Sequence, residues 1–547
     1  MTELPANEID RIANEYFSLL ARAFPVMCAS DEFHFLPRVQ EAVRFLDSMD
    51  ELSQEAIGSI LDSVRNLQAQ LQKEPDILDF EEEIDRQLLL HNMAGLLIEL
   101  EEVKSWRHNP LLYLKVGCIG VDHALNKPYQ DGEERLGRTA ERLSGLKRLL
   151  DQGSKNLSTI PGPYYRVALG VVQDAQKYLD EILFEFDGHS RREQLALPCA
   201  EAQEALSAFG SRLREIGPTP AASVQTASVE ELVQRHFGCT RSLEEIYSIA
   251  EEEWQNSREE MERLRRSIDS SLDWQEIYER YVPSGDGEFD LFKLYGNEIE
   301  TLRKLCQELE LLDDYLDQEV VLAETPTYLC SVRSLASYYA PLGCDPYEKG
   351  LFYITTARLH KNSKSDVSRL KHLHRDYQVV TAHETYPGHH LLDCVRRSLD
   401  NSIRRQIDSA LFYEGWAFYA ESILSERGYF KLPIEELVAC RYRLWRAARC
   451  LIDVGLAMER ITMEEAAILL VSVGHETNEA ISQVERYRLS PGYQICYTLG
   501  KHEILELRQQ FVPQLGWQKF HRLLMEGGQV PFQLASRRFQ NMTDFVR

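Results

Sequence analysis

Apolar residues recur at helical spacing over most of the chain. In residues 9–24, for example, Ile12, Tyr16, Leu19 and Leu20 share one face, which is the three- to four-residue repeat of an amphipathic helix. The pattern returns, with polar or Pro-Gly breaks between the runs, in residues 57–71, 77–100, 136–150, 164–184, 191–213 and 243–268. The chain is therefore predicted to be mainly α-helical.

The pattern changes between Thr327 and Thr356, where aromatic and β-branched residues prevail. Residues 328–332, 338–341 and 351–356 are typical of short strands, and a segment bearing Pro and Gly separates them. We expect a small β-hairpin or sheet beside the helix that follows. Its free edge could pair with an extended peptide as an added strand, or the hairpin could simply pack larger parts of the protein together.

The chain is long enough, at 547 residues, for several domains or for one large unit with two lobes. The clearest interruption of the helical pattern is the Gly-Pro-Thr-Pro segment at residues 217–220. We predict a helical N-terminal lobe over residues 1–220 and a second lobe over residues 221–547, joined as one continuous unit. The second lobe carries the candidate chemistry described below.

Composition narrows the partners and the compartment. The 87 acidic and 61 basic residues give a net charge of −26, which argues against nucleic acid and anionic membrane surfaces as partners. The 11 cysteines include no pair at metal-ligand spacing, so a reducing compartment is expected. Residues 1–11 lack the pattern of a signal peptide, and no apolar stretch is long enough to span a membrane. We expect a cytoplasmic protein, with its oligomeric state left open.

Residues 381–390 contain three histidines and one glutamate. In helical zinc hydrolases, a His-Glu pair followed one turn later by a second His places two imidazoles and a general base around one cation. Here the pair is His383 and Glu384. In the regular motif the second ligand would stand at position 387, which is Pro387.

An unbroken helix would keep the other two histidines away from such a cation. On a regular helix, His389 lies about 240° around from His383, and His390 lies about 10 Å further along the axis. Pro387 removes an N–H and its ring collides with a carbonyl of the preceding turn, whereas Gly388 tolerates unusual backbone angles. The helix is therefore predicted to bulge or break here, which could bring either histidine to the metal.

A third ligand is needed, because a catalytic zinc usually keeps three protein ligands and one open position. The candidate is Glu414, which lies on a later amphipathic helix far enough along the chain for a turn and a return. Glu421 shares its helical face and is the alternative, or it holds a ligand imidazole from behind. His372 and His374 lie near the motif in sequence but are expected to be solvated.

Several motifs together resemble the bacterial family called domain of unknown function 885. They are His-Glu-x-x-Pro-Gly-His-His at 383–390, Glu-Gly-Trp-Ala-x-Tyr-Ala-Glu at 414–421, Glu-Arg-Tyr at 485–487, Pro-Gly at 491–492, and Tyr497 with Gly500. The resemblance covers the chain from about residue 230 to its end. The family in turn resembles the gluzincin metallopeptidases, whose helical members include neurolysin-like oligopeptidases and helical carboxypeptidases.

The resemblance implies a large, two-lobed helical metallopeptidase architecture of the neurolysin or helical gluzincin type. It implies one Zn²⁺ per chain and hydrolysis of peptides or oligopeptides, with carboxypeptidase action as one form. The implied ligands are His383, His389 and Glu414, with His390 as the second choice for the middle position. Two alternatives stay open: a non-catalytic helical binding protein with a structural or decayed metal site, and a metallohydrolase of a non-peptide amide or ester.

The same reading gives roles to further residues. Glu384 would take a proton from a zinc-bound water and pass it to the leaving amine. Family likeness makes Tyr497 the first choice, and Tyr493 the second, for a donor to the oxyanion of the transition state. Arg486 and Arg508 could bind a substrate carboxylate by two-pronged contacts, although a surface salt bridge is an equal alternative for each.

Overall fold

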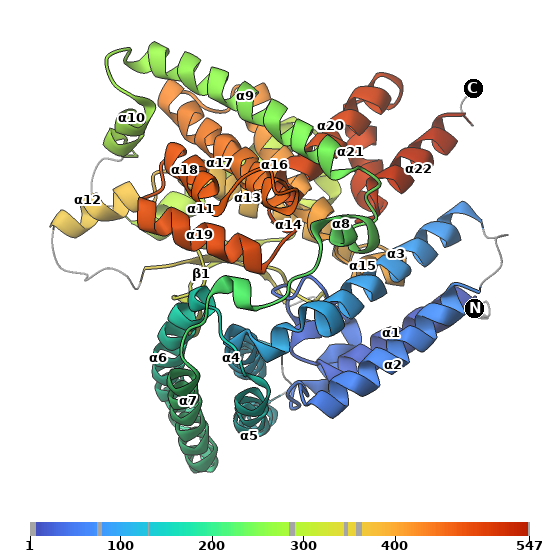
Figure 1. Cartoon of the computed structure of the whole chain (residues 1–547), viewed down its shortest axis with the longest axis vertical. Coiled ribbons are helices and arrows are strands. Elements are labelled where there is room, and N and C mark those ends of the chain that lie inside the picture. The colour runs from blue at the N-terminus through green and yellow to red at the C-terminus, as the bar shows by residue number, and fades with distance from the viewer. Residues whose placement is uncertain are drawn as a thin grey trace.

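The computed structural model describes residues 7–73, 79–128, 131–283, 290–343, 348–356 and 364–544. Within these ranges the protein is mainly α-helical with a small three-stranded sheet (Figure 1), as the apolar pattern predicts. Before the sheet lie α1 (Glu8–Ala23), α2 (Gln54–Leu71), α3 (Phe80–Leu97), α4 (Pro110–Asn126), α5 (Gly132–Asn156), α6 (Gly162–Glu185), α7 (Ala196–Ile216), α8 (Val229–Glu231), α9 (Leu243–Ile268), α10 (Trp274–Arg280) and α11 (Leu291–Glu308).

The sheet and the remaining helices complete the chain. The strands are β1 (Val320–Glu324), β2 (Ala336–Tyr339) and β3 (Gly350–Ile354). The later helices are α12 (Lys364–Leu373), α13 (Tyr377–Glu384), α14 (His389–Arg397), α15 (Ser402–Gln406), α16 (Ala410–Glu426), α17 (Pro433–Ala457), α18 (Met463–Ser472), α19 (Thr477–Leu489), α20 (Ile495–Leu515), α21 (Trp517–Glu526) and α22 (Phe532–Asp544). None of the described helices is both long and apolar enough to cross a membrane.

Local sequence explains where many helices begin. At the start of α9, the Ser242 hydroxyl accepts a hydrogen bond from the Glu245 N–H, and the Glu245 carboxylate accepts one from the Ser242 N–H in return. Thr462 and Glu465 form the same reciprocal pair at the start of α18. Each pair satisfies N–H groups that the first helical turn leaves without partners.

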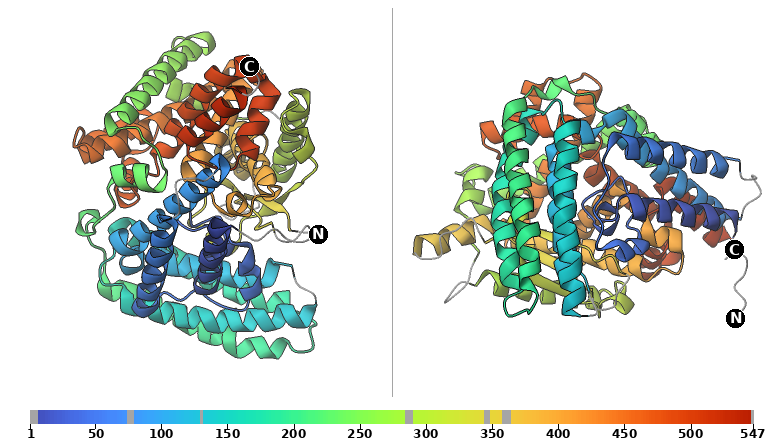
Figure 2. Two further views of the ribbon diagram at one scale, coloured as in Figure 1. Left: turned by 90° about the vertical axis from the view of Figure 1, so that its right-hand side faces the viewer. Right: turned by 90° about the horizontal axis from the view of Figure 1, so that it is seen from below.

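The helices form two groups with a continuous core. In Figure 1, α1–α7 occupy the lower part of the molecule, and α9, α16, α17 and α20 lie above them; Figure 2 shows α6 and α7 side by side on one outer face. The principal cluster of buried apolar side chains nevertheless runs from α1 to α22, and a smaller cluster lies between α9 and α17–α19. The lobe boundary near residue 220 stays a prediction.

The sheet differs in part from the prediction. Its order is β1-β3-β2, with β1 parallel and β2 antiparallel to β3. The predicted strand at 328–332 is wrong: Tyr328 and Leu329 belong to a 3₁₀ turn, in which the Leu329 N–H donates to the Pro326 carbonyl at 2.9 Å. Both side chains are buried, so their apolar character reflects packing of a turn and not a strand.

Two glycines set the distance between α16 and α20. A Cβ on Gly500 would stand 2.2 Å from the Leu411 carbonyl oxygen, and a Cβ on Gly415 would stand 2.5 Å from the Cα of Gly500. The two backbones therefore approach each other as closely as they do only because neither position carries a side chain. This contact explains the glycine of the Glu-Gly-Trp-Ala motif and the glycine that follows Tyr497 in the sequence.

We expect Gly500→Ala to lower the free energy of unfolding by about 1–3 kcal/mol, because the helices must separate to admit a methyl group. Urea unfolding measures the change. The control is Gly137→Ala in α5, where nothing lies within 4 Å of the new Cβ, and where alanine should stabilise the helix by about 0.5–1 kcal/mol. Equal effects at the two positions would contradict the packing argument.

Candidate metal centre

The helix that carries the histidine motif breaks where Pro387 and Gly388 predict it. Helix α13 ends at Glu384 and α14 begins at His389. Between them the chain folds back, and the Gly388 N–H donates to the Ala382 carbonyl at 3.0 Å. A Cβ on Gly388 would meet the His383 carbonyl oxygen at 1.9 Å. Position 388 must therefore be glycine for α14 to start beside the end of α13.

This break brings three of the predicted ligands together. One nitrogen each of His383 and His389 and one carboxylate oxygen of Glu414 all lie within 4.8 Å of one another. Glu414 Oε2 is 3.4 Å from His383 Nε2 and 3.5 Å from His389 Nε2, and the imidazole centroids are 4.6 Å apart. The three side chains are buried. Their role as metal ligands stays a prediction.

The donor set fits a divalent metal ion. Glu414 Oε2 and His389 Nδ1 are buried without a hydrogen-bond partner among the described residues, a costly state for polar atoms. Two imidazoles and one carboxylate form a known zinc ligand set. Burial and the Arg446 charge oppose protonation of His383, but the Glu414 and Glu421 carboxylates raise its pKa to about 9. The two carboxylates thus favour positive charge at the position of His383.

Glu421 and Arg446 hold His383 from behind. Glu421 Oε1 lies 2.7 Å from His383 Nδ1, and Arg446 donates from Nη1 to Glu421 Oε2 at 2.6 Å. All three groups are buried. Because Nδ1 is engaged in this way, Nε2 is the nitrogen that faces Glu414. Glu421 thus lies behind the imidazole, which is the second of the two positions considered from the sequence.

The two adjacent histidines point to different places. The His389 ring stacks on Tyr413 with centroids 3.9 Å apart. His390 Nε2 contacts the Gln318 carbonyl at 2.8 Å, and its Nδ1 contacts the Tyr338 hydroxyl at 3.2 Å. The structure therefore groups His389, and not His390, with the other two candidate ligands.

Two tyrosines of the predicted set contact the other oxygen of Glu414. The Tyr493 hydroxyl donates to Glu414 Oε1 at 2.5 Å and the Tyr497 hydroxyl at 3.0 Å. Tyr497 lies on α20, one turn before Gly500, so the close contact of α16 with α20 positions it. An oxyanion-binding role stays a prediction for both tyrosines.

Glu384 lies at the boundary between the helix break and the sheet. Its Oε2 accepts a hydrogen bond of 2.9 Å from the Tyr338 N–H. Tyr338 belongs to β2, whose one strand neighbour among the described residues is β3, and this N–H points away from β3. The Glu384 carboxylate therefore accepts a hydrogen bond from a backbone N–H on the outer edge of β2. The Glu384 side chain is only partly buried.

The predicted substrate arginines are not brought to these residues. Arg508 makes a two-pronged pair with Glu426 at 2.7 and 2.9 Å. Glu426 ends α16, about 18 Å along the helix from Glu414. Arg486 is exposed on α19. Substrate binding by either arginine stays a prediction. The geometry does not favour it over the alternative of a surface salt bridge.

Two other arginines, which the sequence reasoning missed, do lie here. The guanidinium carbons of Arg446 and Arg449 are 5.4 and 4.3 Å from the centroid of the Tyr497 ring. Together with Arg443 they recur every third residue on α17. That spacing places side chains on one helical face, and it was the signal in the sequence that could have identified them.

The expectation for the neighbouring histidines holds only in part. His372 is about one-third exposed and pairs with Glu279. His374 is buried instead of solvated, and its Nδ1 contacts the Tyr295 hydroxyl at 2.9 Å. The buried ring packs edge-on against Tyr295 of α11, so the place of His374 near the motif reflects packing.

Solved structures show that this fold exists elsewhere. A candidate lipoprotein of unknown function from Shewanella oneidensis is 18% identical, with a TM-score of 0.70, and a candidate lipoprotein from Colwellia psychrerythraea is 16% identical, with a TM-score of 0.74. Each alignment covers 98% of this chain and 100% of the other. A candidate oligoendopeptidase F from Bacillus anthracis aligns with a TM-score of only 0.30 and 14% identity, too low to support an argument.

Sequence comparison identifies a family but no activity. None of the curated proteins matches the chain. A family model described as "Bacterial protein of unknown function (DUF885)" matches residues 39–538. The match contains every residue of the candidate metal centre and nearly all the helices around it.

Proposed function

This chain belongs to the family of bacterial proteins of unknown function DUF885, and we propose that it is a zinc-dependent peptidase that acts on peptides or oligopeptides. The observation that carries the proposal is the convergence of His383, His389 and Glu414 within 4.8 Å. Glu384 directly follows the first of them in the chain, which is the arrangement of ligand and general base found in zinc hydrolases.

In this proposal each residue of the centre has a defined task. His383, His389 and Glu414 hold the ion, which would supply a bound water of lowered pKa, near 7. Glu384 accepts the proton of that water and donates it to the leaving amine. Glu421 fixes the His383 ring, so that Nε2 keeps its direction.

The free edge of β2 supports a peptide as the substrate. The N–H groups of Tyr338 and Ala340 both point away from β3 and donate to carboxylates, those of Glu384 and Asp31 respectively. An extended peptide on this edge would offer carbonyl oxygens to the same donors. Taking the Tyr338 N–H from Glu384 would release that carboxylate for proton transfer, so substrate binding and activation of the base would be linked.

Tyr493 and Tyr497 could serve as donors to the developing oxyanion once the single O–H of either phenol leaves Glu414 Oε1. Burial raises the pKa of both phenols, so they stay protonated at neutral pH. An O–H donor at this place stabilises the negative charge of the oxyanion as it forms. If the enzyme removes C-terminal residues, Arg449 beside Tyr497 is better placed than Arg508 to bind the terminal carboxylate.

We expect the purified chain to bind about one zinc ion and to melt at a higher temperature with zinc than with a chelator, since an ion that binds the folded state stabilises it. His389→Ala should remove both effects, whereas His372→Ala, which changes a partly exposed histidine outside the centre, should remove neither. Metal analysis and thermal unfolding measure this. A wild-type protein that takes up no metal would contradict the proposal and favour a binding protein.

A peptidase and a metallohydrolase of non-peptide substrates can be distinguished by the substrates they cleave. A metallohydrolase of a non-peptide amide or ester would need the same zinc and the same Glu384. Assay of the zinc-loaded protein on a peptide mixture and on simple amides and esters distinguishes them, because only a peptidase should prefer an extended backbone that can pair with β2.

A further inference from the structure

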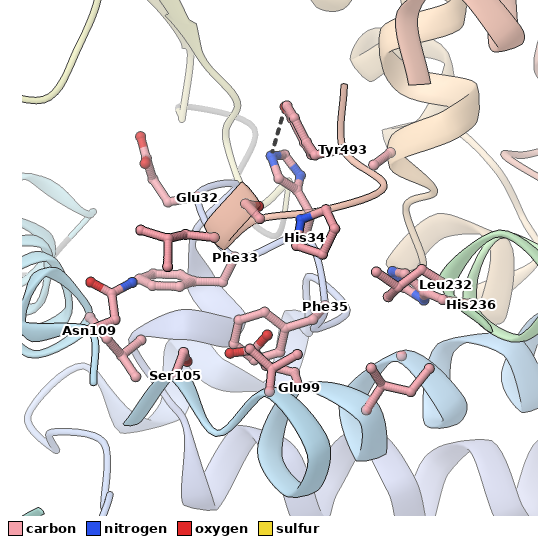
Figure 3. Close-up of a pocket in the computed structure, with 18 of the residues that line it drawn as sticks. Glu32, Phe33, His34, Phe35, Glu99, Ser105, Asn109, Leu232, His236 and Tyr493 are labelled. Carbon is pink, nitrogen blue, oxygen red and sulfur yellow. Dashed lines mark hydrogen bonds between the residues drawn. The ribbon is translucent and has the colours of Figure 1, made fainter. Parts of the chain in front are cut away.

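A cavity of about 370 Å³ lies next to the metal centre, a volume in the range of small-ligand pockets. Figure 3 shows Glu99 on the helix below it and His34 and Tyr493 above it. Tyr493 also donates to Glu414, and Ala410, the first residue of α16, lines the cavity too. One side chain thus separates the cavity from a candidate metal ligand.

The walls come from two unusual helical segments. Among the described residues there are two π-helical segments, η3 (Ile98–Val103) and η7 (Leu232–His236), and both line this cavity. Segment η7 packs against α3, the helix that continues into η3, at Gly95, where a Cβ would meet the His236 ring at 2.0 Å. Widened turns of this kind frequently occur at functional sites. Two at one cavity suggest that it is built to bind a ligand.

The charges in the cavity favour a positively charged group. Lys115, which lines the cavity, and Arg333 both pair with Glu32, so these two cations are already engaged. Glu99 has no ion pair in the part of the chain that the structure describes, although Ser105 stabilises its carboxylate and burial raises its pKa. Burial lowers the pKa of His108 and His236 to about 4, so neither supplies a positive charge at neutral pH. Glu99 therefore remains without a counter-charge.

The remaining lining suits a cation on an apolar stem. Phe33, Phe35 and Tyr164 present aromatic surface to the cavity, and Ile98 and Leu112 present aliphatic surface. Aromatic faces attract ammonium and guanidinium groups. An unpaired carboxylate in such surroundings is costly to the empty protein, and a cationic ligand would remove that cost.

We propose that this cavity binds a positively charged group of the peptide substrate, with Glu99 as the counter-charge and the aromatic side chains around the stem. The group is either a lysine or arginine side chain or the N-terminal ammonium of the peptide. This inference rests on the proposed function, because it places the substrate's charge one side chain away from the centre that would cleave it.

Binding can be measured without turnover. In the zinc-loaded Glu384→Gln chain, calorimetry gives the dissociation constants of alanine pentapeptides that carry one lysine at each position in turn. Each peptide is compared with its norleucine counterpart, which lacks the side-chain charge, and with its N-acetylated form, which lacks the terminal charge. Glu99→Gln is added in the same background. The matched control is Glu101→Gln, which changes an exposed glutamate in the same segment that pairs with Arg65.

We expect one of the two neutralised peptides to bind about 10- to 100-fold more weakly, the range of a hydrogen bond to a charged group. The peptide affected identifies which charge occupies the cavity. The difference should persist with Glu101→Gln and disappear with Glu99→Gln, while neither variant unfolds at a lower temperature than the parent. The proposal is overturned if no charged peptide binds, if neither neutralisation weakens binding, or if the preference survives Glu99→Gln.

The inference and the proposed function can fail separately. Charge-selective binding that depends on Glu99, together with no hydrolysis by the chain with Glu384 intact, would keep the cavity and reject the peptidase. Zinc-dependent hydrolysis without charge selection would keep the peptidase and reject this use of the cavity.

Discussion

Glu384→Gln is expected to lower kcat for a cleaved peptide by about 10²- to 10⁴-fold, the usual contribution of a positioned general acid-base group. Glutamine preserves the volume of the side chain, and its carbonyl oxygen can still accept the Tyr338 N–H that now binds the carboxylate. It cannot accept the proton of a water molecule. The variant should therefore keep its fold and its metal while losing the chemical step.

The assay measures initial rates on one peptide with zinc-loaded protein, with metal content determined on the same samples. The control is Glu319→Gln, which removes an exposed glutamate next to β1 that pairs with Lys349. Equal rates for Glu384→Gln and the wild type would exclude Glu384 from the mechanism. A loss of rate together with loss of metal would instead mean that Glu384 acts on the fold of the site.

Glu421→Gln should have the largest effect on stability. It leaves the buried Arg446 guanidinium with a neutral partner in place of a carboxylate, and breaking a buried ion pair on one side costs about 3–5 kcal/mol. It also weakens the hold on His383 Nδ1, and loss of such a supporting contact typically costs 10- to 100-fold in metal affinity. Urea unfolding and zinc titration measure the two effects.

Removing the second charge separates these effects. In the double variant Glu421→Gln with Arg446→Met, no unpaired charge is left, so much of the lost stability should return while metal affinity stays low. If both properties recover together, Glu421 does not orient His383. A double variant less stable than Glu421→Gln alone would show that Arg446 stabilises the fold through its other contacts, such as the ring of Phe418.

The ion pair of Glu421 with Arg446 predicts the direction in which stability changes with pH. Burial raises the pKa of Glu421, but Arg446 and His383 together outweigh it, so the pKa is lowered overall. A carboxyl with a lowered pKa in the folded state stabilises the protein above its unfolded pKa, and this contribution is lost as the pH falls through the folded pKa. In Glu421→Gln, the metal-free protein should therefore lose less stability between neutral and acidic pH than the wild type.

The sequence predicts well those features that depend on neighbours along the chain. Helix α9 begins after Ser242 because the capping pair lies within four residues. The break between α13 and α14 follows from Pro387 and Gly388, and Glu414 was found because a third ligand was required. The choice between His389 and His390 was not fixed in this way. It depends on the direction in which the chain folds back, which the contact of Gly388 with Ala382 determines.

Features that depend on distant segments were missed. Strand β1 pairs directly and in parallel with β3, although β2 lies between them along the chain. A short, half-exposed segment such as β1 carries little trace of such a partner in its sequence. The role of Arg446 in the site depends on its ion pair with Glu421, which lies on another helix. The cavity beside the centre joins η3 with η7, segments that lie far apart in the sequence, and no local pattern marks Glu99 as unpaired.

The fold-back between α13 and α14 also bears on how related centres can be recognised. Two residues more than in the H-E-x-x-H pattern separate His383 from His389, yet their rings lie side by side because a second helix starts anew after the turn. A search with a fixed count of residues passes over this chain. A description that allows a proline-glycine hinge and compares imidazole positions across it would retrieve proteins whose motif lengths differ but whose donor atoms coincide.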